Sequence, residues 1–129
     1  AQRLVRKLCD GCKKKIKPNQ QIKDLILKTV GELSSDLQEE LDVKKDLIVF
    51  EQKGCTKCGN TGFSGRIALF EMLAITDSIA RIIIDNPSEA NITEEAKRQG
   101  MITMQQDGVI KILKGVTTVE EVLRVVEEK

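Results

Sequence analysis

The sequence of 129 residues contains no histidine, no tryptophan and no tyrosine, and it has only three phenylalanines. Without histidine the chain lacks the usual general base near neutral pH, which excludes Ser-His and Cys-His nucleophile pairs. The shortage of aromatic rings leaves little surface on which nucleic-acid bases could stack. Neither a GxxxxGK[ST] phosphate loop nor a GxGxxG motif is present, so the common nucleotide-binding loops are missing. We therefore predict no catalytic residue and no cofactor-binding loop in this chain.

Long apolar runs are also missing. No stretch approaches the roughly 20 apolar residues of a membrane-spanning helix, and no signal peptide is recognisable, so we expect no transmembrane segment. The chain begins at Ala1 without a methionine, from which we expect it to be a segment of a longer protein.

The charge is nearly balanced but unevenly distributed. The formal net charge is +1, which gives no overall field to attract nucleic acid or an acidic membrane. Residues 1–17, however, carry seven Lys and Arg against Asp10 alone, a local charge of +6. This segment could serve a subunit interface or contact anionic lipid, and a solvated face is an equally good interpretation.

The four cysteines form two CxxC pairs. They are Cys9, Cys12, Cys55 and Cys58. Two CxxC turns that face each other offer four thiolates in a tetrahedron, the arrangement that Zn²⁺ takes in closed structural sites. The spacer over 13–54 is longer than the usual 15–20 residues of a zinc ribbon. Because the cost of loop closure grows only logarithmically, the extra length costs roughly 1 kcal/mol, and we expect the spacer to hold a small element of its own.

Features around the cysteines fit this interpretation. Gly11 and Gly59 are expected to adopt positive φ angles that turn backbone N–H groups toward sulfur. Four thiolates around one zinc ion leave about two net negative charges, which nearby basic residues would offset: Arg6, Lys7, Lys13, Lys14 and Lys57.

Other uses of the cysteines remain open at this point. A redox-active CxxC normally opens a helix after a strand, whereas Cys58 is followed by Gly-Asn-Thr-Gly. Structural disulfides would suit a secreted protein, for which the sequence gives no sign. A catalytic zinc ion needs an open coordination position, which four thiolates do not leave.

Hydrophobic periodicity predicts an α+β fold that is mostly helical. A strand or helix end is expected over 1–8, helices over 20–30 and 32–41, and strands over 46–52 and 66–75. The remainder predicts about four short helices, at roughly 77–86, 90–98, 104–114 and 119–126. Thr76 or Asp77 is the expected cap of the first of them and Thr103 that of the third, and Thr118 with Glu121 predicts a capping box in the fourth.

These elements predict two units. Residues 1–66 would form a small tetracysteine zinc-knuckle module with short strands and a helical insertion at about 18–45. Residues 67–129 would add a strand and a C-terminal helical subdomain, a bundle of about four short helices.

Three segments in this order resemble the C-terminal end of the secretion ATPases. They are "AQRLVRKLCDGCK", "GCTKCGNTGFSGRIALFEML" and "GMITMQQDGVIKILKGVTTVEEVLRV". The family comprises the hexameric motors of type II secretion and type IV pilus assembly, including general secretion pathway protein E. The resemblance covers nearly the whole chain and is weakest over 18–50. Asp-Gly replaces a common proline in the first knuckle, and "ALFEML" replaces a Gly-Ile/Val-Tyr-Glu pattern, neither of which affects a cysteine.

The resemblance implies a site, an activity and partners. Cys9, Cys12, Cys55 and Cys58 fall on the family's four zinc ligands. The ATP- and Mg²⁺-binding core lies upstream in such motors, so this segment would be a non-catalytic C-terminal domain. Its partners would be the inner-membrane platform protein and adjacent ATPase subunits, at the cytoplasmic face of the inner membrane, while the full protein drives pilin or pseudopilin assembly. A segment separated from its core could be monomeric.

Two alternatives belong to other classes. The basic run at the first knuckle would suit a zinc-ribbon nucleic-acid-binding module, although the near-neutral charge and missing aromatics weigh against it, and we expect no nucleic-acid partner. The stretch "CTKCGNTG" is similar to one CxxCxGxG unit of chaperone cysteine-rich domains, but such domains repeat the unit and Asn60 replaces its first glycine.

Overall fold

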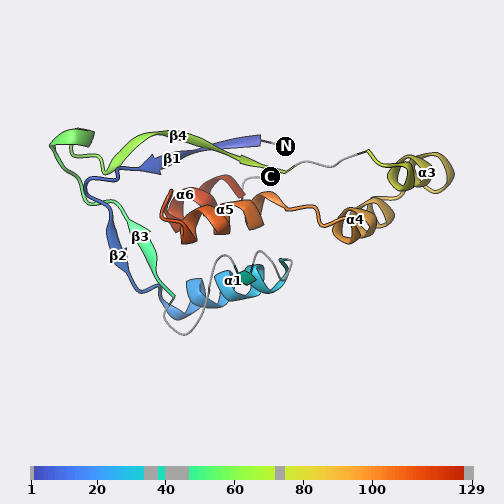
Figure 1. The fold of residues 1–129 in the computed structure, drawn as a ribbon, viewed down its shortest axis with the longest axis horizontal. Helices are drawn as coiled ribbons and strands as arrows, with labels where there is room; N and C mark the ends of the chain where they lie inside the picture. The colour runs from blue at the N-terminus through green and yellow to red at the C-terminus, as the bar shows by residue number, and fades with distance from the viewer. Residues whose placement is uncertain (1, 34–37, 40–46, 72–74, 127–129) are drawn as a thin grey trace.

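The computed structural model describes residues 2–33, 38–39, 47–71 and 75–126. It has an α+β fold with two short antiparallel sheets and helices, as predicted. Figure 1 shows these elements along the longest axis, and within the described residues no helix is both long and apolar enough to cross a bilayer.

Two strand pairs organise the first half. Strand β1 (Gln2–Leu8) pairs antiparallel with β4 (Phe63–Phe70), and the register shifts at a bulge between Arg6 and Leu8. Strand β2 (Lys14–Ile16) pairs with β3 (Val49–Glu51). The prediction for 1–8 resolves to a strand, and those for 46–52 and 66–75 are confirmed in part. The second of them begins earlier, at Phe63, because Phe63 pairs with Leu8 across the bulge.

Helix α1 (Gln20–Gly31) occupies the spacer between the cysteine pairs, as expected for 20–30. The side chain of Asn19 caps it by accepting from the backbone N–H of Ile22 at 2.9 Å. The helix expected over 32–41 lies mostly outside the described residues.

In the part of the chain that the structure describes, four helices follow β4, and they form two pairs. They are α3 (Asp77–Asp85), α4 (Glu89–Arg98), α5 (Met104–Leu113) and α6 (Val119–Val126). Thr76 and Thr103 cap α3 and α5, as predicted. Helix α3 packs on α4, and α5 packs on α6. Figure 1 shows the α3–α4 pair projecting at one end of the molecule.

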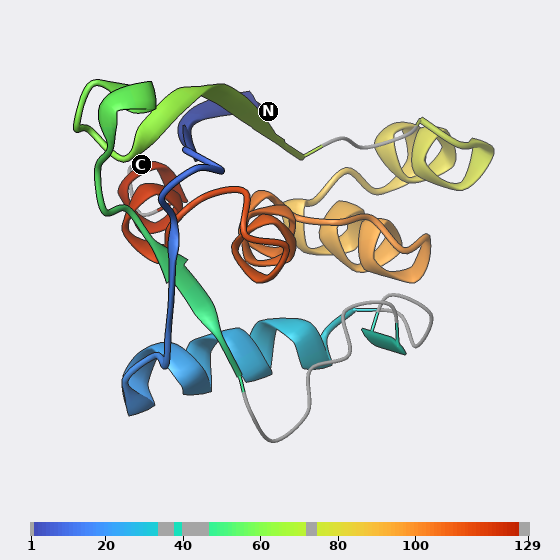
Figure 2. The same cartoon turned by 60° about the vertical axis from the view of Figure 1, so that its left-hand side comes forward.

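The hydrophobic core lies around α5. This helix packs against β4 and β3, and α1 covers its other side, so the β1–β4 sheet, α5 and α1 form successive layers (Figure 2). The core draws on both predicted units: Val5, Ile26, Val30, Leu47, Val49, Leu69, Val109, Ile112, Val122 and Val125. The two units share one core, and the division at residue 66 stays a prediction.

The outer edge of β1 is covered near its C-terminal end by the α5–α6 connection and by α6. The backbone N–H of Arg6 donates to Glu121 Oε1 at 2.7 Å, and the Arg6 carbonyl accepts from Thr117 Oγ1 at 2.8 Å. The N–H of Leu8 donates to the Val116 carbonyl at 2.8 Å. These bonds satisfy the outward backbone groups that an edge strand otherwise leaves unpaired.

The capping box predicted at Thr118 and Glu121 forms in one half only. Thr118 Oγ1 accepts from the N–H of Glu121 at 3.1 Å. The Glu121 carboxylate, instead of returning to Thr118, binds the Arg6 backbone and guanidinium and also Arg124. Burial raises the pKa of Glu121, but the hydrogen bonds from Arg6 and Arg124 outweigh burial and hold it at about 2.

Replacing Glu121 by glutamine is expected to make folding less dependent on pH. Because the pKa of Glu121 in the folded chain lies below its ordinary value of 4.5, its stabilisation is present above about pH 4.5 and is lost as the pH falls toward 2. The stability gap between the parent chain and Glu121→Gln should shrink by about 2 kcal/mol between pH 6 and pH 3. Urea unfolding at matched metal content measures the gap. Glu120→Gln, at an exposed neighbour, is the matched control for the loss of one carboxylate from this helix. A gap for Glu121→Gln that stays constant with pH would contradict the assignment.

Candidate metal centre

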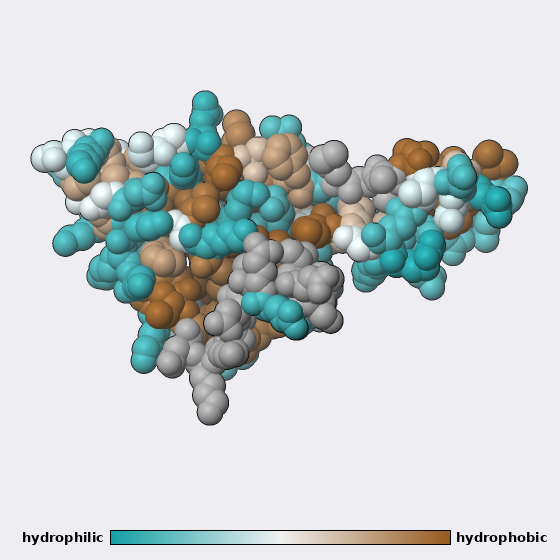
Figure 3. Space-filling view, viewed as in Figure 1, coloured by the Kyte–Doolittle hydropathy of each residue, from teal (hydrophilic) through white to brown (hydrophobic). Residues whose placement is uncertain are grey.

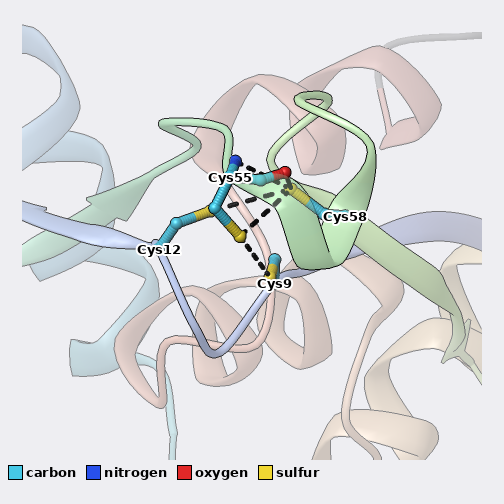
Figure 4. A group of neighbouring side chains, drawn as sticks. All are labelled: Cys9, Cys12, Cys55 and Cys58. Carbon is cyan, nitrogen blue, oxygen red and sulfur yellow. Dashed lines mark hydrogen bonds between the residues drawn. The ribbon is translucent and has the colours of Figure 1, made fainter.

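The two CxxC segments meet at one end of the β1–β4 sheet. Cys9 follows β1 directly, and Cys12 lies at the end of the next turn, just before β2. Cys55 precedes the one-turn 3₁₀ helix η1 (Thr56–Cys58), whose last residue is Cys58. Figure 4 shows the four side chains converging on one point. Two sulfur contacts link the CxxC segments, Cys9 with Cys55 and Cys12 with Cys58. Each joins residues that are 46 positions apart in sequence, and the pairing of β1 with β4 and of β2 with β3 brings them together.

The spacing of the sulfurs fits a tetrahedral metal ion. The Sγ–Sγ distances are 3.8 Å for Cys9–Cys55, 3.8 Å for Cys12–Cys58 and 3.7 Å for Cys55–Cys58. All four Sγ atoms lie within 4.8 Å of one another. A tetrahedron with Zn–S bonds of about 2.3 Å has edges of about 3.8 Å. The sulfurs are too far apart for disulfides, whose S–S bond is about 2.05 Å, and all four cysteines are free.

Backbone N–H groups are directed at two of the sulfurs. Cys58 Sγ accepts from the N–H of Cys55 at 3.2 Å and from that of Gly62 at 3.2 Å. Cys12 Sγ accepts from the N–H of Gly54 at 3.3 Å. Such donors stabilise thiolate, the form in which sulfur binds metal.

The thiol pKa values diverge accordingly. Burial raises the pKa at both Cys58 and Cys12. At Cys58 the two backbone donors outweigh burial and lower the pKa to about 6, whereas at Cys12 burial prevails and raises it to about 11. Four sulfurs at mutual contact cannot all be charged unless a cation lies among them. The set therefore suits a thiophilic divalent ion such as zinc.

Glycine conformation shapes the second knuckle. Gly59 has φ 65° and Gly62 has φ 81°, both in the left-handed region, so the positive φ expected at Gly59 is confirmed. The same expectation for Gly11 is wrong, since Gly11 has no positive φ. An added Cβ at Gly11 would lie 3.4 Å from Lys57 Cδ and 3.7 Å from Cys9 Sγ, so this position is confined by its neighbours instead.

Two of the basic residues near the site, Arg6 and Lys14, pair with carboxylates. Lys14 pairs with Glu51 at 3.1 Å, and Arg6 pairs with Glu121 at 3.2 Å and lies over the Phe63 ring. These ion pairs reduce the positive charge available to nucleic acid along the first knuckle.

Lys13 joins the cysteine cluster to the turn between α5 and α6. Its Nζ donates to the Gly115 carbonyl at 3.0 Å, pairs with Asp10 at 3.3 Å, and lies 5.2 Å from the centroid of the Phe50 ring. Because Lys13 directly follows Cys12, this contact couples the first knuckle to the α5–α6 turn.

Sequence reasoning identified the four sulfurs that the structure brings together, and their role as metal ligands stays a prediction. Sequence reasoning missed the N–H groups of Gly54 and Gly62 that donate to cysteine sulfurs, although both glycines lie within four residues of the second CxxC pair. The hydrogen bond from Lys13 to the Gly115 carbonyl could not be predicted from a local sequence pattern, because the two residues are 102 positions apart.

Comparison with known proteins gives a consistent set of relatives. A family model described as "Type II/IV secretion system protein" matches residues 1–124. The type IV pilus assembly ATPase PilB of Thermus thermophilus is 38% identical over 123 residues, which is 95% of this chain. The type II secretion system protein E of Pseudomonas aeruginosa is 33% identical over 129 residues, 100% of this chain. The type II secretion system ATPase E of Vibrio cholerae is 30% identical over 128 residues, or 99% of the chain.

The matched region is a small part of these relatives. This chain spans 13% of the Thermus protein and 23% of each of the Pseudomonas and Vibrio proteins. Most of the length of each relative therefore lies outside the match.

Proposed function

The chain belongs to the type II/IV secretion system protein family, and from this membership we propose that it is the non-catalytic, zinc-binding C-terminal module of a secretion or pilus-assembly ATPase. The observation that carries the proposal is the convergence of two CxxC turns, with four sulfurs within 4.8 Å, in a chain whose relatives are such ATPases.

Zinc held by Cys9, Cys12, Cys55 and Cys58 would supply a structural cross-link. It would fix the end of β1 to the turn before β4 and hold the β2–β3 pair against the same point. Four thiolates fill the coordination sphere of zinc, so the centre would stiffen the module and would not activate water.

The module is proposed to act beside an ATP-hydrolysing core. The absence of a phosphate loop from the sequence supports a division of labour in which ATP and Mg²⁺ bind elsewhere in the full-length protein. There ATP hydrolysis would drive assembly of pilin or pseudopilin subunits. We propose adjacent ATPase subunits and an inner-membrane platform protein as partners, at the cytoplasmic face of that membrane.

Metal analysis and an ATPase assay test the proposal together. We expect purified chain to hold about one zinc ion, since four thiolates complete one site, and to hydrolyse no ATP above a buffer control. The full-length protein, assayed in parallel, should hold the same zinc and turn over ATP. Far less than one equivalent of zinc in metal-replete protein, or turnover by the chain alone, would refute it.

A further inference from the structure

The turn between α5 and α6 (residues 114–118) contacts the first CxxC pair on both sides. The backbone N–H of Leu8, the residue before this pair, donates to the Val116 carbonyl at 2.8 Å. The Nζ of Lys13, the residue after it, donates to the Gly115 carbonyl at 3.0 Å. The segment that carries two of the four sulfurs is therefore held at its two ends by consecutive carbonyls of one turn.

The second CxxC segment is shaped by its own residues. Cys58 Sγ accepts from the N–H groups of Cys55 and Gly62, which lie in the same segment. In the described part of the chain, the only backbone N–H directed at a sulfur of the first pair comes from Gly54, beside the second pair, and it reaches Cys12 Sγ. The first pair thus depends more than the second on residues outside its own turn.

Hydrophobic packing contributes little to the two CxxC turns themselves. The one-turn helix η1 buries none of its residues, and of the four cysteines only Cys9 is buried. On the face shown in Figure 3, mostly hydrophilic and neutral side chains cover the end of the molecule where these turns lie. The geometry of the four sulfurs therefore depends on hydrogen bonds and on a bound metal ion.

The side chain of Lys13 is confined where it meets the α5–α6 turn. It is 25% exposed, pairs with Asp10 at 3.3 Å and lies 5.2 Å from the centroid of the Phe50 ring. Gly115 has φ 75°, and an added Cβ there would lie 3.2 Å from Lys13 Nζ and 3.0 Å from Phe50 Cε2. The turn approaches Lys13 more closely than a residue with a side chain would allow, so the ammonium group has a defined place.

The α5–α6 turn is itself fixed to the rest of the fold. The N–H of Gly115 donates to the Ile112 carbonyl of α5 at 3.1 Å. Thr117 is completely buried, and its Oγ1 donates to the Arg6 carbonyl of β1 at 2.8 Å. A displacement of the turn would therefore disturb β1 and the first CxxC pair together.

We propose that the α5–α6 turn supports the metal centre from outside, with Lys13 as its positioning residue, so that metal bound by the four cysteines and the seating of this turn stabilise each other. Groups that orient metal ligands from outside contribute to metal affinity without touching the ion. Because binding linkage is reciprocal, a turn that strengthens metal binding is itself held more firmly when metal is bound. This inference rests on the proposed function, in which the four cysteines hold zinc.

Zinc affinity of Lys13 variants tests the positioning role. Lys13→Met keeps the length of the side chain and removes the ammonium group, and we expect it to bind zinc about 10-fold more weakly in competition with a chelator. Lys13→Arg keeps a permanently charged donor and should recover most of the affinity. Lys15→Met is the matched control at an exposed lysine of β2 and should bind zinc like the parent. Parent-like affinity in Lys13→Met, or equal weakening in Lys13→Met and Lys13→Arg, would overturn the proposal.

Amide hydrogen exchange of the zinc-loaded chain reports on the turn itself. The Leu8 amide donates to Val116 and makes no contact with the Lys13 side chain. At equal zinc occupancy, this amide should exchange about 10-fold faster in Lys13→Met than in the parent, because the turn is held less firmly. Lys15→Met should leave its exchange unchanged. Parent-like protection of Leu8 in zinc-loaded Lys13→Met would overturn the mutual stabilisation.

A variant on the far side of the turn gives an independent readout. Thr117→Val removes the hydrogen bond to Arg6 and contacts no cysteine, yet it should also weaken zinc binding by about 10-fold. Thr93→Val, at an exposed position of α4, should not. If both variants act through the same turn, the Lys13→Met and Thr117→Val double variant should lose far less than the roughly 100-fold that independent effects would give. A full product of the two losses, or parent-like affinity in Thr117→Val, would overturn the proposal, and should Lys13→Met fail to fold, Thr117→Val alone decides.

The parent chain separates this inference from the proposed function. A parent chain that binds one zinc ion, with Lys13→Met binding it equally tightly, would contradict only the support from the α5–α6 turn. A metal-replete parent chain that holds no zinc would contradict the proposed function itself.

Discussion

Replacing Cys55 by serine is expected to unfold at least residues 1–66. A structural zinc ion in a tetracysteine site contributes about 10–16 kcal/mol of binding free energy, most of which is folding free energy. That exceeds or equals the whole stability of a typical small domain, about 5–15 kcal/mol. Cys55 contacts both Cys9 and Cys58, at 3.8 and 3.7 Å, so its loss opens the junction between the two knuckles.

Thermal melting followed by circular dichroism, with zinc measured in the same samples, checks this prediction. Cys55→Ser should lose the bound metal and most of the cooperative transition, and chelation of zinc from the parent chain should reproduce that curve. Thr56→Ser is the matched control, because Thr56 is an exposed neighbour in the same turn and should melt like the parent. A Cys55→Ser curve that overlays the parent curve would refute a structural metal site here.

Gly62→Ala should give the second-largest loss. Gly62 has φ 81°, and an added Cβ would lie 2.3 Å from Gln52 Cβ and 3.0 Å from Gln52 Cα. Its N–H donates to Cys58 Sγ at 3.2 Å and its carbonyl accepts from the N–H of Cys9 at 2.9 Å, so the backbone cannot move away without disturbing two of the four cysteines. Overpacking and left-handed strain together should cost about 3 kcal/mol or more.

Gly65→Ala separates the two causes. Gly65 has φ 79° but no atom lies within 4 Å of its added Cβ, so this variant should show only the conformational cost of about 1–2 kcal/mol. Urea unfolding gives both values, and competition with a chelator should show zinc affinity about 10- to 100-fold weaker in Gly62→Ala alone. Equal losses in the two variants would mean that the contact with Gln52 does not limit this position.

The features predicted correctly from sequence have local or compositional signals. Thr76 and Thr103 cap their helices through contacts three residues away. The four cysteines form the only CxxC pairs, so their meeting needed no knowledge of the path between them.

Features that depend on distant partners were not predictable in this way. Glu121 satisfies the spacing of a capping box with Thr118, yet its carboxylate binds Arg6, 115 residues away. A buried carboxylate gains more from a guanidinium and a strand N–H than from one neighbouring amide. The capping-box pattern considers only residues three apart, so it cannot take account of Arg6 as a partner for Glu121.

During synthesis on the ribosome, β1 emerges long before the residues that cover it. Arg6 and Glu121 are separated by 115 residues, an interval of roughly 6–23 seconds at about 5–20 residues per second. Through that interval the outward groups of β1 are free to pair with other extended segments. A nascent chain that stops before residue 116 would lack Val116, Thr117 and Glu121, the partners of these outward groups. The synthesis of α6 thus supplies Glu121, the last of these partners to leave the ribosome.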